Sequence, residues 1–347
     1  MPELIYPPKP QPGDRVAVVS PSRGLPEIFP EVYETGLTRL RDVLKLEPVE
    51  YPTTRTMGAD PRERARDLQA AFADPNIAAV MSTIGGDDQI TVVPHLDPEV
   101  LRANPKPFFG YSDNTNLLNL LYDCGIVSYH GGSVMVHLGR GGVLHPYHRD
   151  SLRAALFTSD WYEVSPADEW GDQPGDWNDP VARSAPPKMW PSDGWVWRGP
   201  ANRVVQGRLW GGNLEVLSWL LMAGRVGPTE RYAGRVLAIE TSEELPTDTE
   251  VYRILRSMGE RRLLAGFPAV LVGRAKAWEF DKPNPPEVKR AFAAAQREAV
   301  ERALGEYAPD AVVVFDLDIG HTDPNLILPY GGQVRVDATA RRIAVRY

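Results

Sequence analysis

Three side chains of catalytic type each follow a short apolar run of the chain: Ser112, Glu240 and His321. The runs, each predicted to be a strand, are Pro107–Tyr111, Arg235–Ile239 and Ala311–Phe315. A serine nucleophile needs a base, and the base needs an acid that orients it, so the three types together predict acyl transfer. Read singly, His321 is also explained as a hydrogen-bonded loop residue, and Glu240, with Glu243 and Glu244 beside it, as a solvated acid.

Ser112 stands between a predicted strand and a predicted helix, Asn114–Asp123, and Gly110 precedes it by two positions. A sharp turn here would expose the hydroxyl at the helix N-terminus, where backbone N–H groups and the helix dipole favour negative charge. The G-x-S-x-G nucleophile motif is incomplete because position 114 is Asn. The alternative interpretation is that Ser112 or Asp113 only caps the helix.

A glycine pair, Gly85-Gly86, follows the apolar run Ile77–Ser82. Glycine lets the backbone approach a substrate closely, and acyl transfer needs N–H donors for the developing oxyanion. The pair is equally consistent with an ordinary strand-to-helix turn. It is not a phosphate-binding loop, because neither a Lys-Ser/Thr partner nor G-x-G-x-x-G is present.

Metal and cofactor chemistry is not indicated. The histidines His137, His145 and His148 match no standard metal-binding spacing. Cys124 is the single cysteine, so the chain can form neither an internal disulfide nor a cysteine-based zinc site. We therefore expect a hydrolase without metal or cofactor, in a reducing, cytoplasmic setting.

The composition limits the classes of partner. The chain has 347 residues and a formal net charge of -8, which argues against a nucleic-acid or polybasic membrane surface. No apolar run reaches the ~18 residues of a membrane span. At about 150 residues per domain, this length predicts two domains.

The elements that must position these residues alternate between strand and helix. Further predicted strands are Val16–Ser20 and Ile126–Tyr129, and Asp60-Pro61 is a typical helix start. In the second half we expect helices at Gly211–Ala223, Thr249–Met258 and Pro286–Glu306, a strand at Ala269–Val272 and a terminal hairpin. Continuous apolar strands between helices predict a parallel sheet covered on both faces, that is, an α/β fold. The expected organisation is an N-terminal α/β domain (1–158), a linker (159–200) and a C-terminal domain (201–347).

Residues 159–200 contain six of the nine tryptophans and have no sustained periodicity. We interpret the segment as a linker and lid, because a long irregular loop in a compact protein is usually functional and this density of Trp argues against disorder. Trp177 and Trp190 are candidates to stack on a flat ligand. A packed structural cover is the alternative.

Several motifs together resemble one known family. They are PGDRVAVVSPS, STIGGDD, GYSDNTNLL around Ser112, IETSEE at Glu240 and DIGHTDPN at His321. The sequence resembles the LD-carboxypeptidase and microcin C self-immunity family of serine peptidases from residue 12 to about 332. The resemblance implies a Ser112-Glu240-His321 triad, with oxyanion donors at the backbone amides of Gly86 (or Gly85) and Asp113.

The same resemblance implies a Rossmann-like N-terminal domain, a C-terminal α/β domain with a small barrel-like sheet, and a homodimer. It also implies one of two substrates. The self-immunity branch cleaves an aminoacyl group from a nucleotide-like moiety, and the Trp-rich segment favours this branch; the other branch removes D-alanine from murein tetrapeptides. Asn213 is a candidate for substrate recognition, or else a helix cap. A homologue that binds without turnover is the third alternative.

Overall fold

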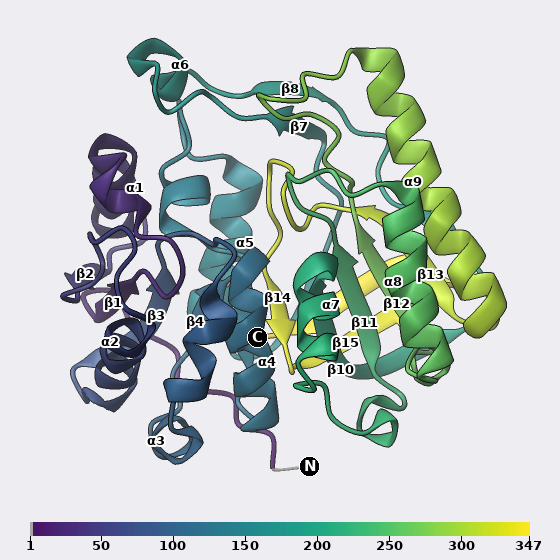
Figure 1. Cartoon of the computed structure of the whole chain (residues 1–347), viewed down its shortest axis with the longest axis horizontal. Coiled ribbons are helices and arrows are strands. Elements are labelled where there is room, and N and C mark those ends of the chain that lie inside the picture. The colour runs from purple at the N-terminus through teal and green to yellow at the C-terminus, as the bar shows by residue number, and fades with distance from the viewer. Residues whose placement is uncertain (1–2) are drawn as a thin grey trace.

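The computed structural model describes residues 3–347 and shows a mixed α/β fold on one large, mostly parallel sheet (Figure 1). Its strands run in the order β2-β1-β3-β4-β5-β14-β10-β11-β12-β13-β9. The first half of the chain contributes β1 (Arg15–Val19), β2 (Glu47–Glu50), β3 (Ile77–Ser82), β4 (Phe108–Gly110) and β5 (Ser128–His130). The second half contributes β9 (Val196–Arg198), β10 (Val204–Asn213), β11 (Val236–Glu240), β12 (Ala269–Gly273), β13 (Val312–Leu317) and β14 (Leu328–Tyr330).

A smaller antiparallel sheet begins at the first half of β10, which pairs with β15 (Gln333–Asp337). It continues through β16 (Arg342–Arg346) to β6 (Trp161–Val164). These strands correspond to the small sheet that the resemblance implied for the C-terminal part. Strands β15 and β16 form the expected terminal hairpin.

Helices cover both faces of the large sheet. They are α1 (Pro30–Asp42), α2 (Pro61–Ala73), α3 (Pro98–Ala103), α4 (Thr115–Asp123), α5 (Pro146–Phe157), α7 (Leu214–Met222), α8 (Asp248–Glu260) and α9 (Pro286–Tyr307). Strand β1 shows why both faces are buried: Val16 and Val18 enter one core, while Ala17 and Val19 enter the other. None of the described helices is long and apolar enough to cross a membrane.

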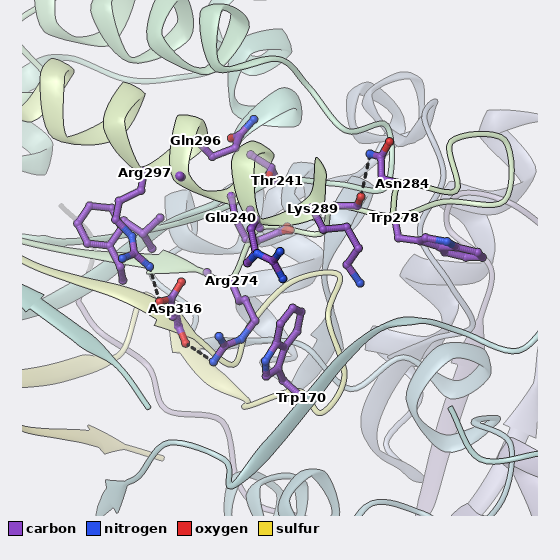
Figure 2. A pocket seen from close by; sticks show the side chains of 18 of the residues that line it. Trp170, Glu240, Thr241, Arg274, Trp278, Asn284, Lys289, Gln296, Arg297 and Asp316 are labelled. Carbon is purple, nitrogen blue, oxygen red and sulfur yellow. Dashed lines mark hydrogen bonds and ion pairs between the residues drawn. The ribbon is translucent and has the colours of Figure 1, made fainter. Parts of the chain in front are cut away.

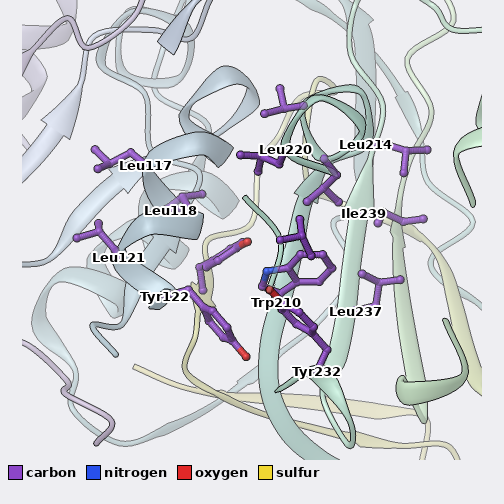
Figure 3. Close-up of a cluster of buried hydrophobic side chains, with 14 of the residues drawn as sticks. Leu117, Leu118, Leu121, Tyr122, Trp210, Leu214, Leu220, Tyr232, Leu237 and Ile239 are labelled. Carbon is purple, nitrogen blue, oxygen red and sulfur yellow. The ribbon is translucent and has the colours of Figure 1, made fainter. Parts of the chain in front are cut away.

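The two halves of the chain share a core. Strand β5 pairs antiparallel with β14, so the sheet passes from one half to the other without interruption. On one face, α4 packs against β10 and α7 (Figure 3). The buried Trp210 donates from its indole nitrogen to Asn119 Oδ1 at 3.1 Å. The boundaries at 158 and 200 stay a prediction.

The predicted helix at Gly211–Ala223 begins too early. Gly211 and Gly212 are the last part of β10 before its end at Asn213, with φ of 138° and 108°. A Cβ on Gly211 would lie 1.9 Å from the carbonyl oxygen of Ala238 on the neighbouring strand. The glycines therefore allow close strand contact, and the helix begins at Leu214.

Residues 159–200 are more regular than we expected. Strand β6 extends the small sheet and β9 forms an edge of the large one, pairing with β13. Between them, β7 (Glu169–Gln173) and β8 (Lys188–Pro191) form a two-stranded sheet, joined through a short helix α6 (Pro180–Ser184). Each strand has only three to five residues, too few for a period-two pattern to stand out.

Candidate active site

Ser112 occupies the strained turn between β4 and α4. Its φ is +62°, in the left-handed region that residues with a Cβ rarely adopt. Gly110 is required because a Cβ there would lie 2.9 Å from Ser82 Oγ and from the Asn114 side chain. The Asn114 amide donates to the Tyr111 carbonyl at 3.0 Å and accepts from Gln89 Nε2 at 2.9 Å. The side chain of Asn114 thus stabilises the turn through these two hydrogen bonds.

His321 joins the serine to the glutamate across the two halves of the chain. Its Nε2 lies 3.1 Å from Ser112 Oγ, and its Nδ1 lies 2.7 Å from Glu240 Oε2. Glu240 is the last residue of β11, and His321 follows β13. Because β11 and β13 both lie in the parallel part of the sheet, their carboxyl ends bring the two side chains to one edge. This is the order of contacts that serine hydrolases use.

The charges at this site stabilise an imidazolium. Burial alone lowers the pKa of His321, but Glu240 and Glu243 outweigh it and raise the pKa to about 9. Burial likewise opposes ionisation of Glu240, yet the charge of His321 holds the pKa of Glu240 down, at about 2. The pair is therefore an ionised carboxylate beside a protonated ring.

Glu243 is a site residue that sequence reading missed. Its Oε2 lies 3.1 Å from His321 Nε2, the nitrogen that also faces Ser112 Oγ. Half of its side chain is exposed, whereas Glu240 is almost fully buried. Its place three residues after Glu240 is the signal that could have indicated it.

The glycine turn lies against Ser112. A Cβ on Gly85 would fall 3.1 Å from Ser112 Oγ and 3.4 Å from the backbone nitrogen of Asp113. A Cβ on Gly86 would instead fall 2.1 Å from Ser22 Oγ. Thus Gly85 borders the small space beside the serine and the Asp113 amide, and Gly86 packs on the neighbouring loop.

Asp113 itself is fully buried and ties the surrounding loops together. Its Oδ2 accepts from Ser22 Oγ at 2.5 Å and from the backbone N–H of Gln89 at 2.8 Å. Burial raises the pKa of Asp113, although these hydrogen bonds oppose the shift. The side chain therefore holds the loop after the glycine turn close to the Ser112 turn.

Ser112 and His321 line a cavity of about 480 Å³, which we name the serine cavity. Trp177 lines it too, with its ring 5.3 Å from Phe29 in an edge-on contact. An ion pair, Arg140 Nε to Asp323 Oδ2 at 2.6 Å, forms part of the wall. Of the two candidate stacking residues, only Trp177 lines the cavity that contains Ser112.

Trp190 and Asn213 do not line the serine cavity, although Asn213 pairs in register with Glu240 on the neighbouring strand. Trp190 lines a different cavity, beside Trp170. Asn213 caps α7, since its Oδ1 accepts from the Val216 N–H at 2.9 Å, and it is outside the lining of the serine cavity. Its buried Nδ2 has no hydrogen-bond partner within residues 3–347. A role for Asn213 in substrate recognition stays a prediction.

The three histidines considered for a metal make other contacts. The rings of His137 and His148 stack at 4.5 Å, and burial lowers the pKa of both. His148 Nδ1 lies 2.7 Å from the Asn325 carbonyl oxygen, and His145 caps α5. Across the part of the chain described, no group of three His, Cys, Asp or Glu is placed to hold a metal ion.

Comparison with known proteins identifies the family. Residues 16–131 match the model of the LD-carboxypeptidase N-terminal domain, and residues 206–336 match that of the LD-carboxypeptidase C-terminal domain. The two matches cover most of the chain and contain all three residues of the Ser-His-Glu cluster. The chain belongs to the LD-carboxypeptidase family.

Relatives fall in both branches of this family. The chain is 28% identical to the microcin C7 self-immunity protein MccF of Escherichia coli, over 82% of this chain and 78% of that one. It is also 28% identical to the murein tetrapeptide carboxypeptidase of Pseudomonas aeruginosa, over 91% of each chain. An MccF-like protein from Streptococcus pneumoniae, solved in complex with AMP, superposes with a TM-score of 0.84 at 25% identity, covering 96% of this chain and 99% of that one.

Proposed function

We propose that the protein is a cofactor-free serine hydrolase with Ser112, His321 and Glu240 as its catalytic triad. The observation that carries this proposal is the position of His321, 3.1 Å from the serine hydroxyl and 2.7 Å from the buried carboxylate. The strained turn at Ser112 and membership of a peptidase family support it.

In this mechanism neutral His321 accepts the Ser112 hydroxyl proton at Nε2 while Oγ bonds to the acyl carbon. Glu240 holds the ring through Nδ1 and stabilises its positive charge. The carbonyl oxygen becomes an oxyanion beside Gly85, where the Asp113 amide and an amide of the glycine turn donate to it. The bond to the leaving group then breaks, and the leaving group takes the proton from His321. Water then attacks the acyl carbon while His321 accepts one of its protons. The bond between Ser112 Oγ and the acyl carbon breaks, and Oγ takes the proton back from His321.

The substrate class we propose is an aminoacyl group joined by an amide-type bond to a nucleotide-like moiety. Trp177 in the wall of the serine cavity supports it, because an indole face suits a nucleobase. The similarity to MccF and to an AMP-bound MccF-like protein points the same way. The second candidate is removal of the terminal D-alanine from murein tetrapeptides, favoured by similarity along 91% of a murein tetrapeptide carboxypeptidase. A cytoplasmic homodimer is part of the proposal.

Product analysis distinguishes these activities. Purified protein and its Ser112→Ala variant are incubated separately with aspartyl sulfamoyl adenosine and with a murein tetrapeptide, and products are followed by mass spectrometry. We expect the wild type to release aspartate from the nucleoside, and Ser112→Ala to release none. Release of D-alanine alone establishes the murein activity instead. Binding of either compound without turnover shows a non-catalytic homologue and overturns the proposal.

A further inference from the structure

A second and larger cavity lies on the other side of β7 from the serine. Its volume is about 910 Å³, and we name it the α9 cavity (Figure 2). It is enclosed by the N-terminal part of α9, the carboxyl ends of β11 and β12, and the β7–β8 pair. Such a volume is typical of a pocket for an organic ligand.

The α9 cavity is separate from the serine cavity. Ser112, His321 and the glycine turn do not line it, and Gln173 is the residue the two linings share. Along β7 the neighbours divide between them: Trp170 faces the α9 cavity, and Asp172 faces the serine cavity. An ion pair between Asp172 and Lys289 of α9 joins the two sides and forms part of the partition.

Basic side chains dominate the charged lining of the α9 cavity. The bases are Lys188, Arg274, Lys289, Arg290 and Arg297, and the acids are Asp193, Glu240 and Asp316. Three of the bases are paired with carboxylates: Arg297 with Asp316 at 2.5 Å, Lys289 with Asp172, and Arg274 with Asp318 at 3.7 Å. Glu240 faces His321, so Lys188 and Arg290 are left against Asp193. Arg290 is exposed on α9, and no ion pair engages it within the described chain. The remaining charge therefore favours an anion.

Indole rings lie directly against these cations. The guanidinium of Arg274 is 4.8 Å from the Trp170 ring centre, and Lys289 Nζ is 4.4 Å from that of Trp190 (Figure 2 shows Arg274 and Trp170). The two indoles are 5.9 Å apart and tilted by 43°, and both are partly exposed. The guanidinium of Arg274 is held in place by Ser192 Oγ at 3.2 Å and Asp318 Oδ1 at 3.7 Å from its Nη2. Rings and cations together form a surface that a flat anionic molecule can stack on and pair with.

We propose that the α9 cavity is a binding site for a small aromatic anion, with its ring on Trp170 and Trp190 and its phosphate or carboxylate at Lys188 and Arg290. Glu240 and Thr241 form part of the wall, so a bound ligand contacts the strand end that carries the triad glutamate. The proposal rests on this cavity and not on the proposed hydrolysis, because binding is measured without turnover.

Calorimetric titration with three probes tests the site: 1-naphthyl phosphate, the neutral 1-naphthol and inorganic phosphate. We expect the naphthyl phosphate to bind at least about tenfold more tightly than either probe that lacks one of its two groups. Trp190→Ala is expected to weaken its binding about tenfold or more. Arg290→Glu changes an exposed side chain and leaves the core untouched. It is expected to weaken the binding of 1-naphthyl phosphate but not that of 1-naphthol.

The matched control is Trp177→Ala, which removes an indole from the serine cavity and is expected to leave the naphthyl phosphate affinity unchanged. Circular dichroism confirms that each variant is folded. The proposal is overturned if the probe does not bind at ~5 mM, if neither Trp190→Ala nor Arg290→Glu weakens it, or if Trp177→Ala alone abolishes it. The last result would place the probe in the serine cavity.

Discussion

Glu243 Oε2 lies 3.1 Å from Nε2 of His321, the nitrogen that accepts the serine proton in the proposed mechanism. In the free protein Glu243 and Ser112 therefore share one ring nitrogen, and a second carboxylate stabilises the protonated ring. A protonated His321 cannot act as a base. In the proposed mechanism His321 must first lose this proton, and Glu243, together with Glu240, raises the pKa at which it does so.

We expect Glu243→Gln to lower the pH at which kcat/KM rises. This ratio reports ionisation in the free enzyme, and it increases as His321, whose pKa is raised, loses its proton. Removing one of the two anions lowers the pKa of His321, so the rise moves to lower pH. The exposed neighbour Glu244 supplies the control, since Glu244→Gln should leave the rise in place. An unchanged pH profile in Glu243→Gln would show that Glu243 does not act on His321.

Loss of either Ser112 or His321 is expected to reduce kcat about 10⁴-fold. The reason is that the hydroxyl and its base act as one unit, 3.1 Å apart. The double variant should be no slower than Ser112→Ala alone, as measured by single-turnover kinetics on folded protein. Multiplying losses in the double variant would mean that the two residues serve different steps.

Gly85→Ala is expected to reduce kcat by about 100- to 1000-fold, the scale of one lost oxyanion donor. The added methyl would lie 2.9 Å from Ser112 Cβ, so the serine turn would have to shift, and 3.1 Å from Ser112 Oγ and 3.4 Å from the Asp113 nitrogen, beside the proposed oxyanion position. Gly305→Ala on α9 is the control, because a Cβ there meets nothing within 4 Å. Steady-state kinetics and melting temperatures of both variants test this prediction. Full activity in a stable Gly85→Ala protein would show that the oxyanion is bound elsewhere.

Trp177→Ala is expected to raise KM for aspartyl sulfamoyl adenosine about tenfold, through the loss of one ring stack. The same change should have little effect on a murein peptide, which has no base to stack. The control is Trp161→Ala on β6, a partly exposed indole outside the serine cavity lining. If KM is unchanged in Trp177→Ala, the indole does not bind the base and the aminoacyl-nucleotide proposal loses its structural support.

Much of the local structure followed from local physical rules. The helix start at Asp60-Pro61 was predicted from a capping residue and a proline, and Asp60 indeed accepts from the Arg62 N–H. Strand β3 lies where its apolar run predicted, at Ile77–Ser82. The early helix at Gly211 was wrong because a glycine pair opening a helix and a glycine pair closing a strand have the same local pattern; only the neighbouring carbonyl of Ala238 decides between them.

The sequence by itself determined which residue types could do the chemistry and that each follows a strand: Ser112, Glu240 and His321. The tertiary structure decided which side chains share a space. It separated Trp190 from Trp177, although both stand in one Trp-rich segment, because Trp190 lies on β8 beside the α9 cavity and Trp177 lies in the loop between β7 and α6 beside the serine cavity. It also brought Glu243 to within 3.1 Å of His321 Nε2, although His321 lies 78 positions further along the chain, through sheet pairing that no local pattern predicts. Residue types and their spacing indicate most of the local conformation, but distances between side chains depend on long-range packing.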